Sequence, residues 1–444
     1  VRRSMAGRSI GGLLDAPVMT DPEQRAIMSI VANVIPCAYI GRPSVFPLFA
    51  LKGVSLSLRH GNTEESCFAY SIYSLMLVAV FGDIPGGFQF SEMSIQLNEK
   101  FDDPRLKGAL LHLHGDHVNF WSRHIRTGFP ILERAFQACL EVGDLVYAVA
   151  VAFQTVWQAV ERGDSLEEVR RLSQRYAAFT RESKNEAIHQ TIRMQQQLLS
   201  CLEGSTRGDA SLDDDGFDEQ VFLALVTQAS LGCGVAFYHI IKLILLYAHE
   251  RYEEALASAL AARDVLGAVM AMPIEATYSF YLALALAARR AEAGSPQESA
   301  DRALLREHLA KLSLWAEHCP ENFEHEELLV RAEVARIEGR PLEAEDLYDR
   351  AILSAQKNEF PHYHQAGARA RGARAGRAGA RLPPGGARAL RLLGAQAVLT
   401  GVSSAVAQTL VGLGVELGGL ITCGSLPIDL HLHGSDVYFQ DPAG

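Results

Sequence analysis

The sequence has little that would place the chain outside the cell or in a membrane. Its seven cysteines lie far apart, form no C-x-x-C pair and fall mostly within apolar helical patterns, so we expect buried free thiols in a reducing compartment. Residues 1–17 carry positive charge but lack the continuous apolar run of a secretory signal. The best candidate for a membrane helix, Leu231 to Ala248, is interrupted by His239 and Lys242. We therefore predict a cytoplasmic protein with no membrane partner.

The short motifs of nucleotide and nucleophilic chemistry are absent as well. The chain has no G-x-x-x-x-G-K-[ST] phosphate loop, no H-R-D or D-F-G kinase signature and no G-x-S-x-G elbow. The glycines of Gly412 to Gly418 have one spacer residue too many for a dinucleotide fingerprint, and they follow a predicted helix rather than a strand. We predict that the chain is not an enzyme and has no catalytic residue and no cofactor.

One histidine-rich stretch invites a metal interpretation. His112, His114 and His117 lie close together in LLHLHGDHVNFW, and Asp116 is a further candidate ligand. In an α-helix, however, residues five apart point to different faces, and no fixed fourth ligand is evident. We therefore expect solvated or core histidines here and no metal site.

A second stretch resembles a calcium loop. The run Asp213 to Gly216 lies in an acidic segment, 204–219, and fits several positions of such a loop. Phe222 stands where the loop needs its bidentate carboxylate. We interpret the segment as an acidic surface loop.

The net charge of −11 is unevenly distributed. From Ala366 onward the chain has seven arginines, no lysine and four acids, a net charge of +3, so the preceding residues carry −14. An acidic body argues against non-specific nucleic-acid binding. The tract from Arg369 to Arg391 has no interleaved aromatic residues, so a solvated linker is favoured and no nucleic-acid partner is expected.

The chain contains a helix-turn-helix pattern that recurs at nearly even spacing. Its turns are Gly82-Asp83, Gly163-Asp164, Glu250-Arg251 and Gly339-Arg340, separated by 81, 87 and 89 residues. Apolar residues three and four apart follow each turn. Units that cannot bury their own apolar faces are typical of a helical-repeat array. The pattern predicts a mainly α fold of antiparallel helix pairs stacked as a tetratricopeptide-like (TPR-like) α-solenoid.

Local signals also mark individual helix ends. Asp21 followed by Pro22 is typical of a helix start. Ser165 with Glu168 forms a capping-box pattern. The Cys319-Pro320 dipeptide predicts a break between two helices of one hairpin.

Composition divides the chain into five parts. We predict a disordered N-terminus (1–20), a TPR-like helical region (21–360), an Arg/Ala/Gly linker (361–388), a small incomplete β-α-β unit (389–426) and a disordered tail (427–444). The β-α-β unit would consist of a strand over Ala395–Thr400, a helix over Ser403–Leu413 and a strand over Gly419–Cys423.

Three stretches of the helical region resemble one protein family. FPLFALKGVSLSLRHGNTEESCFAYSIYSLMLVAVFGD (Phe46 to Asp83), residues Arg123 to Ala148 and residues Gly339 to Phe360 are similar to the region that follows the ATPase module in large bacterial signalling proteins. Those proteins begin with a serine/threonine kinase and continue with an AAA-type ATPase. The resemblance spans about residues 21–360. It implies a regulatory or interaction surface and carries over no catalytic residue.

The tail resembles a second family. ALRLLGAQAVLTGVSSAVAQTLVGLGVELGGLIT (Ala389 to Thr422) is similar to the second half of a STAS domain of the stressosome type. In that family the threonine of the A-Q-T motif is a phosphorylation site, which implies Thr409 as the candidate phosphoacceptor. The first half of the STAS sheet has no counterpart upstream, which suggests an internal deletion or a shifted reading frame.

These patterns together predict a non-catalytic scaffold of bacterial signal transduction. Its expected partners are other signalling modules, namely kinase, ATPase and STAS-type proteins, and the parent protein would be a serine/threonine kinase–ATPase. One alternative is a small-molecule sensor with a ligand on the concave helical surface, for which Leu111 to Trp121 is the first candidate stretch. Another is partner switching regulated by phosphorylation of Thr409.

Overall fold

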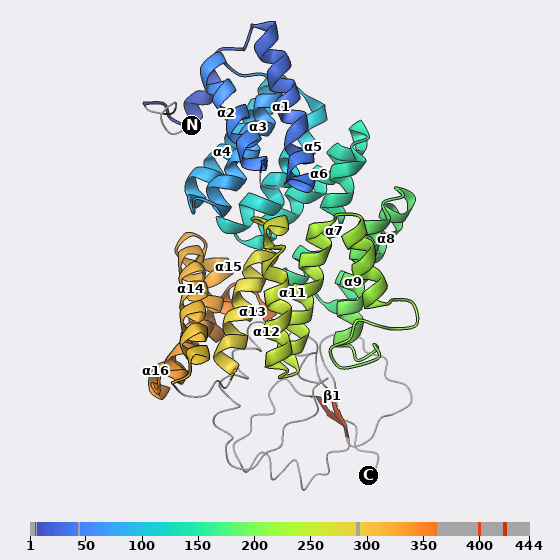
Figure 1. The fold of residues 1–444 in the computed structure, drawn as a ribbon, viewed down its shortest axis with the longest axis vertical. Helices are drawn as coiled ribbons and strands as arrows, with labels where there is room; N and C mark the ends of the chain where they lie inside the picture. Colours follow the sequence, from blue (N-terminus) through green and yellow to red (C-terminus); the bar gives the residue numbers. More distant parts are fainter. Residues whose placement is uncertain are drawn as a thin grey trace, which may run out of the picture. The chain divides into compact units, whose positions relative to one another are not determined.

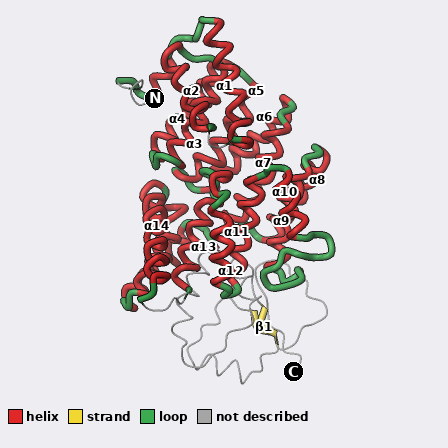
Figure 2. The backbone as a smooth tube through the Cα atoms, in the orientation of Figure 1, coloured by secondary structure: helices red, strands yellow, loops and turns green. Residues whose placement is uncertain are grey.

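The described part of the chain is almost entirely helical (Figures 1 and 2). The computed structural model describes residues 5, 7–42, 45–289 and 294–361, and two short strands, 398–400 and 421–423. Within these ranges the α-helices are α1 (Pro22–Gly41), α2 (Phe46–His60), α3 (Glu64–Ala79), α4 (Ile84–Phe101), α5 (Pro104–His112), α6 (Gly128–Val142), α7 (Leu145–Arg162), α8 (Leu166–Glu182), α9 (Glu186–Leu202), α10 (Glu219–Gln228), α11 (Gly232–Ala248), α12 (Tyr252–Arg263), α13 (Ile274–Ala288), α14 (Pro296–His318), α15 (Pro320–Ile337) and α16 (Pro341–Lys357). Shorter helical turns are η1 (Gly11–Asp15), η2 (Leu113–Val118), η3 (Asn119–Trp121), η4 (Ile125–Thr127) and η5 (Leu266–Val269). The chain divides into two units, Val1–Gly394 and Ala395–Gly444.

The recurring turns lie where the sequence predicts them. Gly82, Gly163, Glu250 and Gly339 have φ angles of 66°, 79°, 63° and 75°, in the left-handed region that ends many helices. Each turn joins an odd-numbered helix to the next: α3 to α4, α7 to α8, α11 to α12 and α15 to α16. The amide after the turn then bonds back into the ending helix, as from Arg340 to the carbonyl of Ala335 at 2.9 Å. These four turns therefore recur once every four helices, that is, once every two hairpins.

The predicted helix starts are also confirmed. The carboxylate of Asp21 accepts hydrogen bonds from the amides of Glu23 and Gln24 at the start of α1. At α8, the hydroxyl of Ser165 accepts from the Glu168 amide at 3.3 Å, and the Glu168 carboxylate accepts from the Ser165 amide at 3.1 Å. Both groups of amides have no partner within their own helix, so these caps satisfy them.

Removing the Ser165 cap should destabilise the fold measurably. We expect Ser165→Ala to lower the free energy of unfolding by about 1 kcal/mol, because the amide that the hydroxyl satisfies loses its partner. Ser165→Asp should stay within about 0.5 kcal/mol of the wild type, since aspartate is an equally good cap. Urea unfolding followed by circular dichroism measures both. Equal losses in the two variants would contradict a capping role.

Part of the N-terminal segment that is predicted to be disordered, residues 7–20, is described by the structure and makes specific contacts. Leu13 in η1 and Met19 are buried. The Asn62 amide donates to the Pro17 carbonyl at 2.8 Å, and the Met19 amide donates to the Asn62 carbonyl at 2.9 Å. The Asn62 side chain also donates to the Leu13 carbonyl at 2.8 Å. Asn62, far along the chain, therefore supplies hydrogen-bond partners to residues 13–19 that their own composition does not reveal.

Distant segments of the helical unit meet in one aromatic cluster. The Trp121 ring lies 4.9 Å from Trp315 in α14 and stacks on Phe323 in α15 at 5.6 Å. Beside it, the Asn322 side chain donates to the carbonyls of Phe120 and Arg123 and accepts from the amide of Ile125 at 3.0 Å. In a simple solenoid each repeat contacts only its neighbours. Here η3 and η4 pack directly against α14 and α15, so the stacked hairpins also make contacts between repeats far apart in the sequence.

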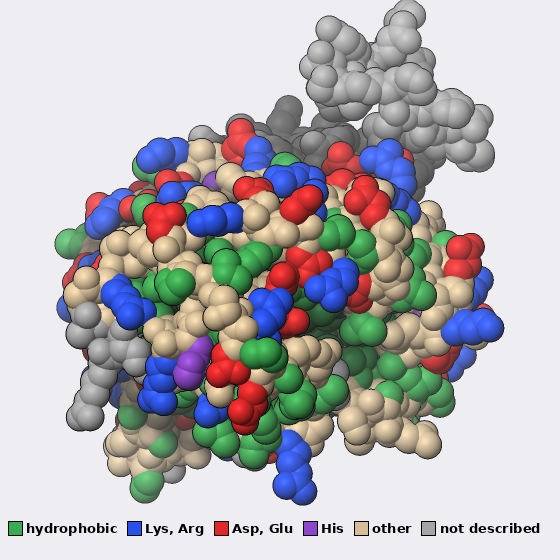
Figure 3. All heavy atoms as spheres, turned by 90° about the horizontal axis from the view of Figure 1, so that it is seen from above, with side chains coloured by type: hydrophobic (Ala, Val, Ile, Leu, Met, Phe, Trp, Pro, Cys, Tyr) green, Lys and Arg blue, Asp and Glu red, His purple; other side chains and the backbone are tan. Residues whose placement is uncertain are grey.

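The surface of the helical unit mixes both signs of charge. On the face in Figure 3, basic and acidic side chains alternate, and hydrophobic side chains form small groups between them. Many of the charges belong to pairs within one helix, such as Arg302 with Glu298 at 2.7 Å and Lys311 with Glu307 at 3.3 Å. Among the helices of the described ranges, none is long and apolar enough to span a membrane.

The second unit has two described strands, β1 (Val398–Thr400) and β2 (Ile421–Cys423). They pair in parallel, with Val398 opposite Ile421 and Thr400 opposite Cys423. The helix expected between them lies outside the described residues, as do the predicted tail and nearly all of the predicted linker. A STAS-like unit therefore stays a prediction.

Candidate functional site

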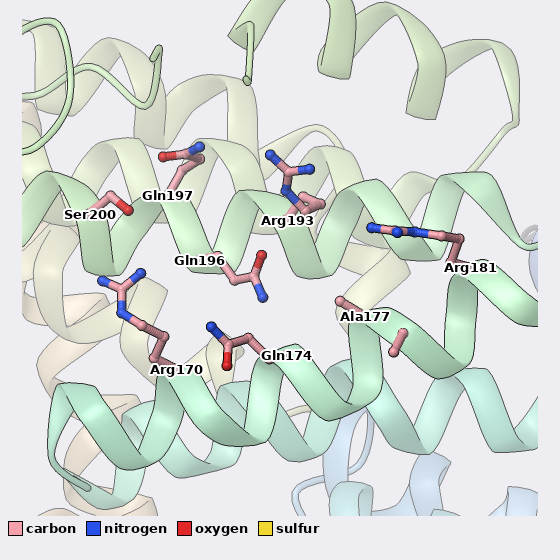
Figure 4. A pocket seen from close by; sticks show the side chains of 9 residues that line it. Arg170, Gln174, Ala177, Arg181, Arg193, Gln196, Gln197 and Ser200 are labelled. Carbon is pink, nitrogen blue, oxygen red and sulfur yellow. The ribbon is translucent and has the colours of Figure 1, made fainter. Parts of the chain in front are cut away.

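A groove of about 360 Å³ lies between the antiparallel helices α8 and α9 (Figure 4). The residues that line it are mainly arginines and amides: Arg170, Gln174, Ala177, Ala178, Arg181, Arg193, Gln196, Gln197 and Ser200. Small residues on α8, such as Ala177, leave the space open between the longer side chains. None of the lining residues is acidic, although the whole chain carries a net charge of −11.

Hydrogen bonds hold part of the groove in place. Arg193 donates to the carbonyl of Gly216 at 3.1 Å, and Gln197 donates to the carboxylate of Asp214 at 2.7 Å. Both bonds tie α9 to the loop that follows it. Arg170 is paired with Glu203 at the end of α9. These side chains are therefore held in position at the edge of the groove before any ligand arrives.

Arg181 is the most available cation of the groove. It is exposed, and it makes no ion pair within the described ranges of the chain. Figure 4 shows Arg181 and Arg193 at one end of the groove, with Gln174 and Gln196 near its middle. A guanidinium presents several donors in a fixed plane, a geometry that suits carboxylates and phosphates. The groove is therefore suited to an extended acidic ligand.

The acidic loop after α9 has a structural explanation. Asp213 accepts a hydrogen bond from the Glu219 amide at 2.7 Å, and Asp214 accepts from the Gly216 amide at 2.6 Å. Asp215 is exposed and pairs with Arg207. The first two carboxylates thus fix the backbone of the loop. The segment is not only a surface loop, because the side chains of Leu212 and Phe217 are buried.

A second site is a buried polar cluster formed by His112, Asp116 and His117. Each residue offers one ligand atom, and these atoms all lie within 4.8 Å of one another. The three residues are 3%, 1% and 4% exposed. Two glutamines of α7 line the cluster: Gln154 bonds to Nε2 of His112, and Gln158 donates to Oδ1 of Asp116 at 2.7 Å.

Burial shifts the protonation of all three groups. Desolvation lowers the pKa of His117 to about 4, and desolvation together with the neighbouring His117 lowers the pKa of His112 to about 4. Desolvation raises the pKa of Asp116 to about 6. At neutral pH the two imidazoles are therefore uncharged, and each keeps one ring nitrogen with a free lone pair, whereas the carboxyl of Asp116 holds a proton more readily than an exposed aspartate does.

The geometric reason for rejecting a metal site at these residues was wrong. It assumed an α-helix, but residues 113–118 form the π-helix η2, in which hydrogen bonds run from residue i to i+5. The wider turn brings His112 and His117 onto one side, with ring centroids 5.5 Å apart. Gly115 permits this turn to approach α6, since a Cβ there would lie 3.0 Å from Ile131.

A sequence signal for the cluster does exist on α7. Gln154, Gln158 and Glu161 recur at spacings of four and three in an otherwise apolar helix, and all three are buried. Such a polar stripe needs polar partners on the facing segment. His114, by contrast, lies apart from the cluster: its Nδ1 contacts the Ser91 hydroxyl at 2.9 Å, and its ring packs on Phe88.

Two further predicted sites have different outcomes. The stretch Leu111 to Trp121 was the first candidate for a ligand surface, but each of its residues is buried, so it cannot line a concave ligand surface. The candidate phosphoacceptor Thr409 lies outside the described residues, and its modification stays a prediction.

Comparison with known proteins supports the repeat type. Residues 174–365 match the family model of CHK1-like TPR repeats. This stretch is a TPR-like helical-repeat region. The match begins within α8 and reaches past α16, so it includes most of the groove. No curated protein and no solved structure matches the chain.

Proposed function

We propose that the helical region is a non-catalytic scaffold of a signalling protein and that it docks an acidic segment of a partner in the α8–α9 groove. The observation that carries the proposal is the lining of the groove, which has three arginines and no acid in a net acidic chain. Charge of one sign at a docking surface raises the rate of association and selects partners of the opposite sign. TPR-like repeats, which stack into extended surfaces, suit this role.

The preformed edge of the groove supports a protein ligand. Arg193 is already held by the loop after α9, so little side-chain entropy is lost when a partner binds it. Arg181 and Gln174 are exposed and remain adaptable. An extended acidic peptide could therefore contact fixed donors on α9 and mobile donors on α8. Following the resemblance of the region, we propose kinase, ATPase or STAS-type modules as the source of that peptide.

The test is a selection of peptides from a random displayed library on the full chain. We expect the selected peptides to be enriched in Asp and Glu. The double variant Arg181→Glu/Arg193→Glu should bind them at least tenfold more weakly, which is about 1.4 kcal/mol or more. Fluorescence anisotropy at two salt concentrations measures the affinities, and binding should weaken as salt rises.

Arg171→Glu is the matched control, because Arg171 is an exposed arginine of α8 that does not line the groove. It should change the affinity less than twofold. Selected peptides without acidic enrichment, or equal affinities for the groove variant and the control, would contradict the proposal. Turnover in a broad substrate screen, abolished by one groove substitution, would contradict its non-catalytic part.

A further inference from the structure

Hydrogen bonds determine which ring nitrogen carries the proton in the two histidines of the buried cluster. Nδ1 of His117 contacts the Met270 carbonyl at 3.1 Å, and a carbonyl only accepts, so this nitrogen carries the proton. In the same way, Nε2 of His112 donates to the side-chain oxygen of Gln154. The opposite nitrogens, Nε2 of His117 and Nδ1 of His112, are left with their lone pairs. Each imidazole is therefore oriented by a hydrogen bond on one side and open on the other.

The carboxylate of Asp116 follows the same arrangement. Its Oδ1 accepts a hydrogen bond from Gln158, while its Oδ2 is buried with no hydrogen-bond partner. The Nδ1 atom of His112 is likewise buried and unpartnered. Oδ2 of Asp116 and Nε2 of His117 are 3.6 Å apart, too far for a hydrogen bond. One ligand atom from each of the three residues therefore lies within 4.8 Å of the others, and two buried acceptors of the cluster have no hydrogen-bond partner, which is costly.

We propose that His112, Asp116 and His117 bind one divalent transition-metal ion, with Zn²⁺ as the best match to their donor set. Two neutral imidazoles and one carboxylate are common ligands of Zn²⁺ and of other ions of this class. A cation bound by one atom of each residue would compensate the unpartnered buried acceptors of the cluster. Gln154, Gln158 and the Met270 carbonyl then occupy the outer positions that orient ligands in metal sites.

The dimensions of the cluster fit this ion after a small adjustment. Ligand atoms about 2.1 Å from a tetrahedral zinc lie about 3.4 Å apart. The ligand atoms of the cluster lie within 4.8 Å of one another. Side-chain movements of about 1 Å therefore bring them to the separation that zinc requires. Three protein ligands leave a fourth position for water.

Binding would stabilise a junction between distant segments. All three ligands come from the end of α5 and from η2, and their outer partners come from α7 and from the segment between α12 and α13. The same segment accepts a hydrogen bond from Trp121 at the Ala271 carbonyl, 2.9 Å away. The ion would therefore fix η2 against two other parts of the helical unit. This inference is independent of the function proposed for the groove.

The experiment uses the purified full chain, stripped with a chelator and reloaded with zinc chloride. After removal of free metal, mass spectrometry of the elements should find about one zinc per chain in the wild type. Asp116→Asn and His117→Gln should each retain less than a tenth of that amount. Gln158→Met should weaken zinc binding by about 10- to 100-fold, the usual effect of removing an outer partner. Zinc should also raise the melting temperature of the wild type.

His114→Gln is the matched control, because His114 is a buried histidine of η2 outside the cluster. It should bind zinc as the wild type does. Circular dichroism establishes that each variant is folded, and X-ray absorption of the zinc-loaded wild type should show nitrogen and oxygen ligands without sulfur. A folded wild type that binds no zinc, sulfur ligation, or equal zinc content in folded Asp116→Asn would each overturn the proposal.

Discussion

Trp121→Ala should lower the free energy of unfolding by about 4 kcal/mol. Trp121 is 1% exposed, and its ring contacts Trp315 and Phe323 on two other helices. Truncation leaves a cavity where three segments meet, and the Ala271 carbonyl loses the indole donor. Trp121→Phe keeps an aromatic ring but loses the hydrogen bond, so we expect about half of that loss. Urea unfolding, followed by circular dichroism, measures both variants.

The control for this experiment is Phe81→Ala, at an aromatic residue that is 48% exposed. It should change the free energy of unfolding by less than about 0.5 kcal/mol, because little surface is buried there. An unfolding midpoint for Trp121→Ala equal to that of the control would mean that η3 does not link the preceding helices, α1 to α5, to α14 and α15. A transition that splits into two steps would show instead that the two parts keep separate stability.

Glu161→Gln should stabilise the protein above neutral pH and have a much smaller effect in mild acid. Desolvation raises the pKa of Glu161 to about 7 in the folded state, although a hydrogen bond from Thr277 opposes this shift. The ordinary value is 4.5. Between these two values the folded state binds more protons than the unfolded state, so stability falls as pH rises from about 4.5 to about 7. The full cost of ionising the buried group, about 3 kcal/mol, is reached near pH 8.

Glutamine has no charge to bury, so the variant should be more stable than the wild type by up to about 3 kcal/mol at pH 8 and by less than about 1 kcal/mol at pH 5. Urea unfolding at pH 5, 6, 7 and 8 gives the difference directly. Glu167→Gln, at an exposed acid of α8, is the control and should show no such trend. A constant difference between Glu161→Gln and the wild type across this range would rule out a buried carboxyl that ionises near neutrality.

The repeat architecture could be predicted because its signals are local. A left-handed turn residue such as Gly163 and a cap such as Ser165 act within a few residues of themselves, so their spacing reveals where helices begin and end. The break at Cys319-Pro320 is of the same kind, and α14 ends at His318 while α15 begins at Pro320. These features required no knowledge of which helix packs on which.

The candidate sites were harder to predict because they depend on pairs of distant residues. The groove needs Arg181 of α8 beside Arg193 of α9, and neither residue forms a motif on its own. The contacts of residues 13–19 depend on Asn62, which bonds to them through its backbone and its side chain. Composition alone could not indicate either arrangement.

The sequence by itself determined the class of the protein: helix pairs at a regular spacing, closed by turns whose conformations follow from their own residues. Only the tertiary structure decided which side chains meet between the helices to form the candidate sites. The π-helical turn of η2 places His112 beside His117, although an α-helical periodicity separates them. The partners of these residues come from α7 and from the Met270 segment. Local backbone preferences fix a helix within a few residues, whereas a site is fixed by packing between residues that the sequence keeps far apart.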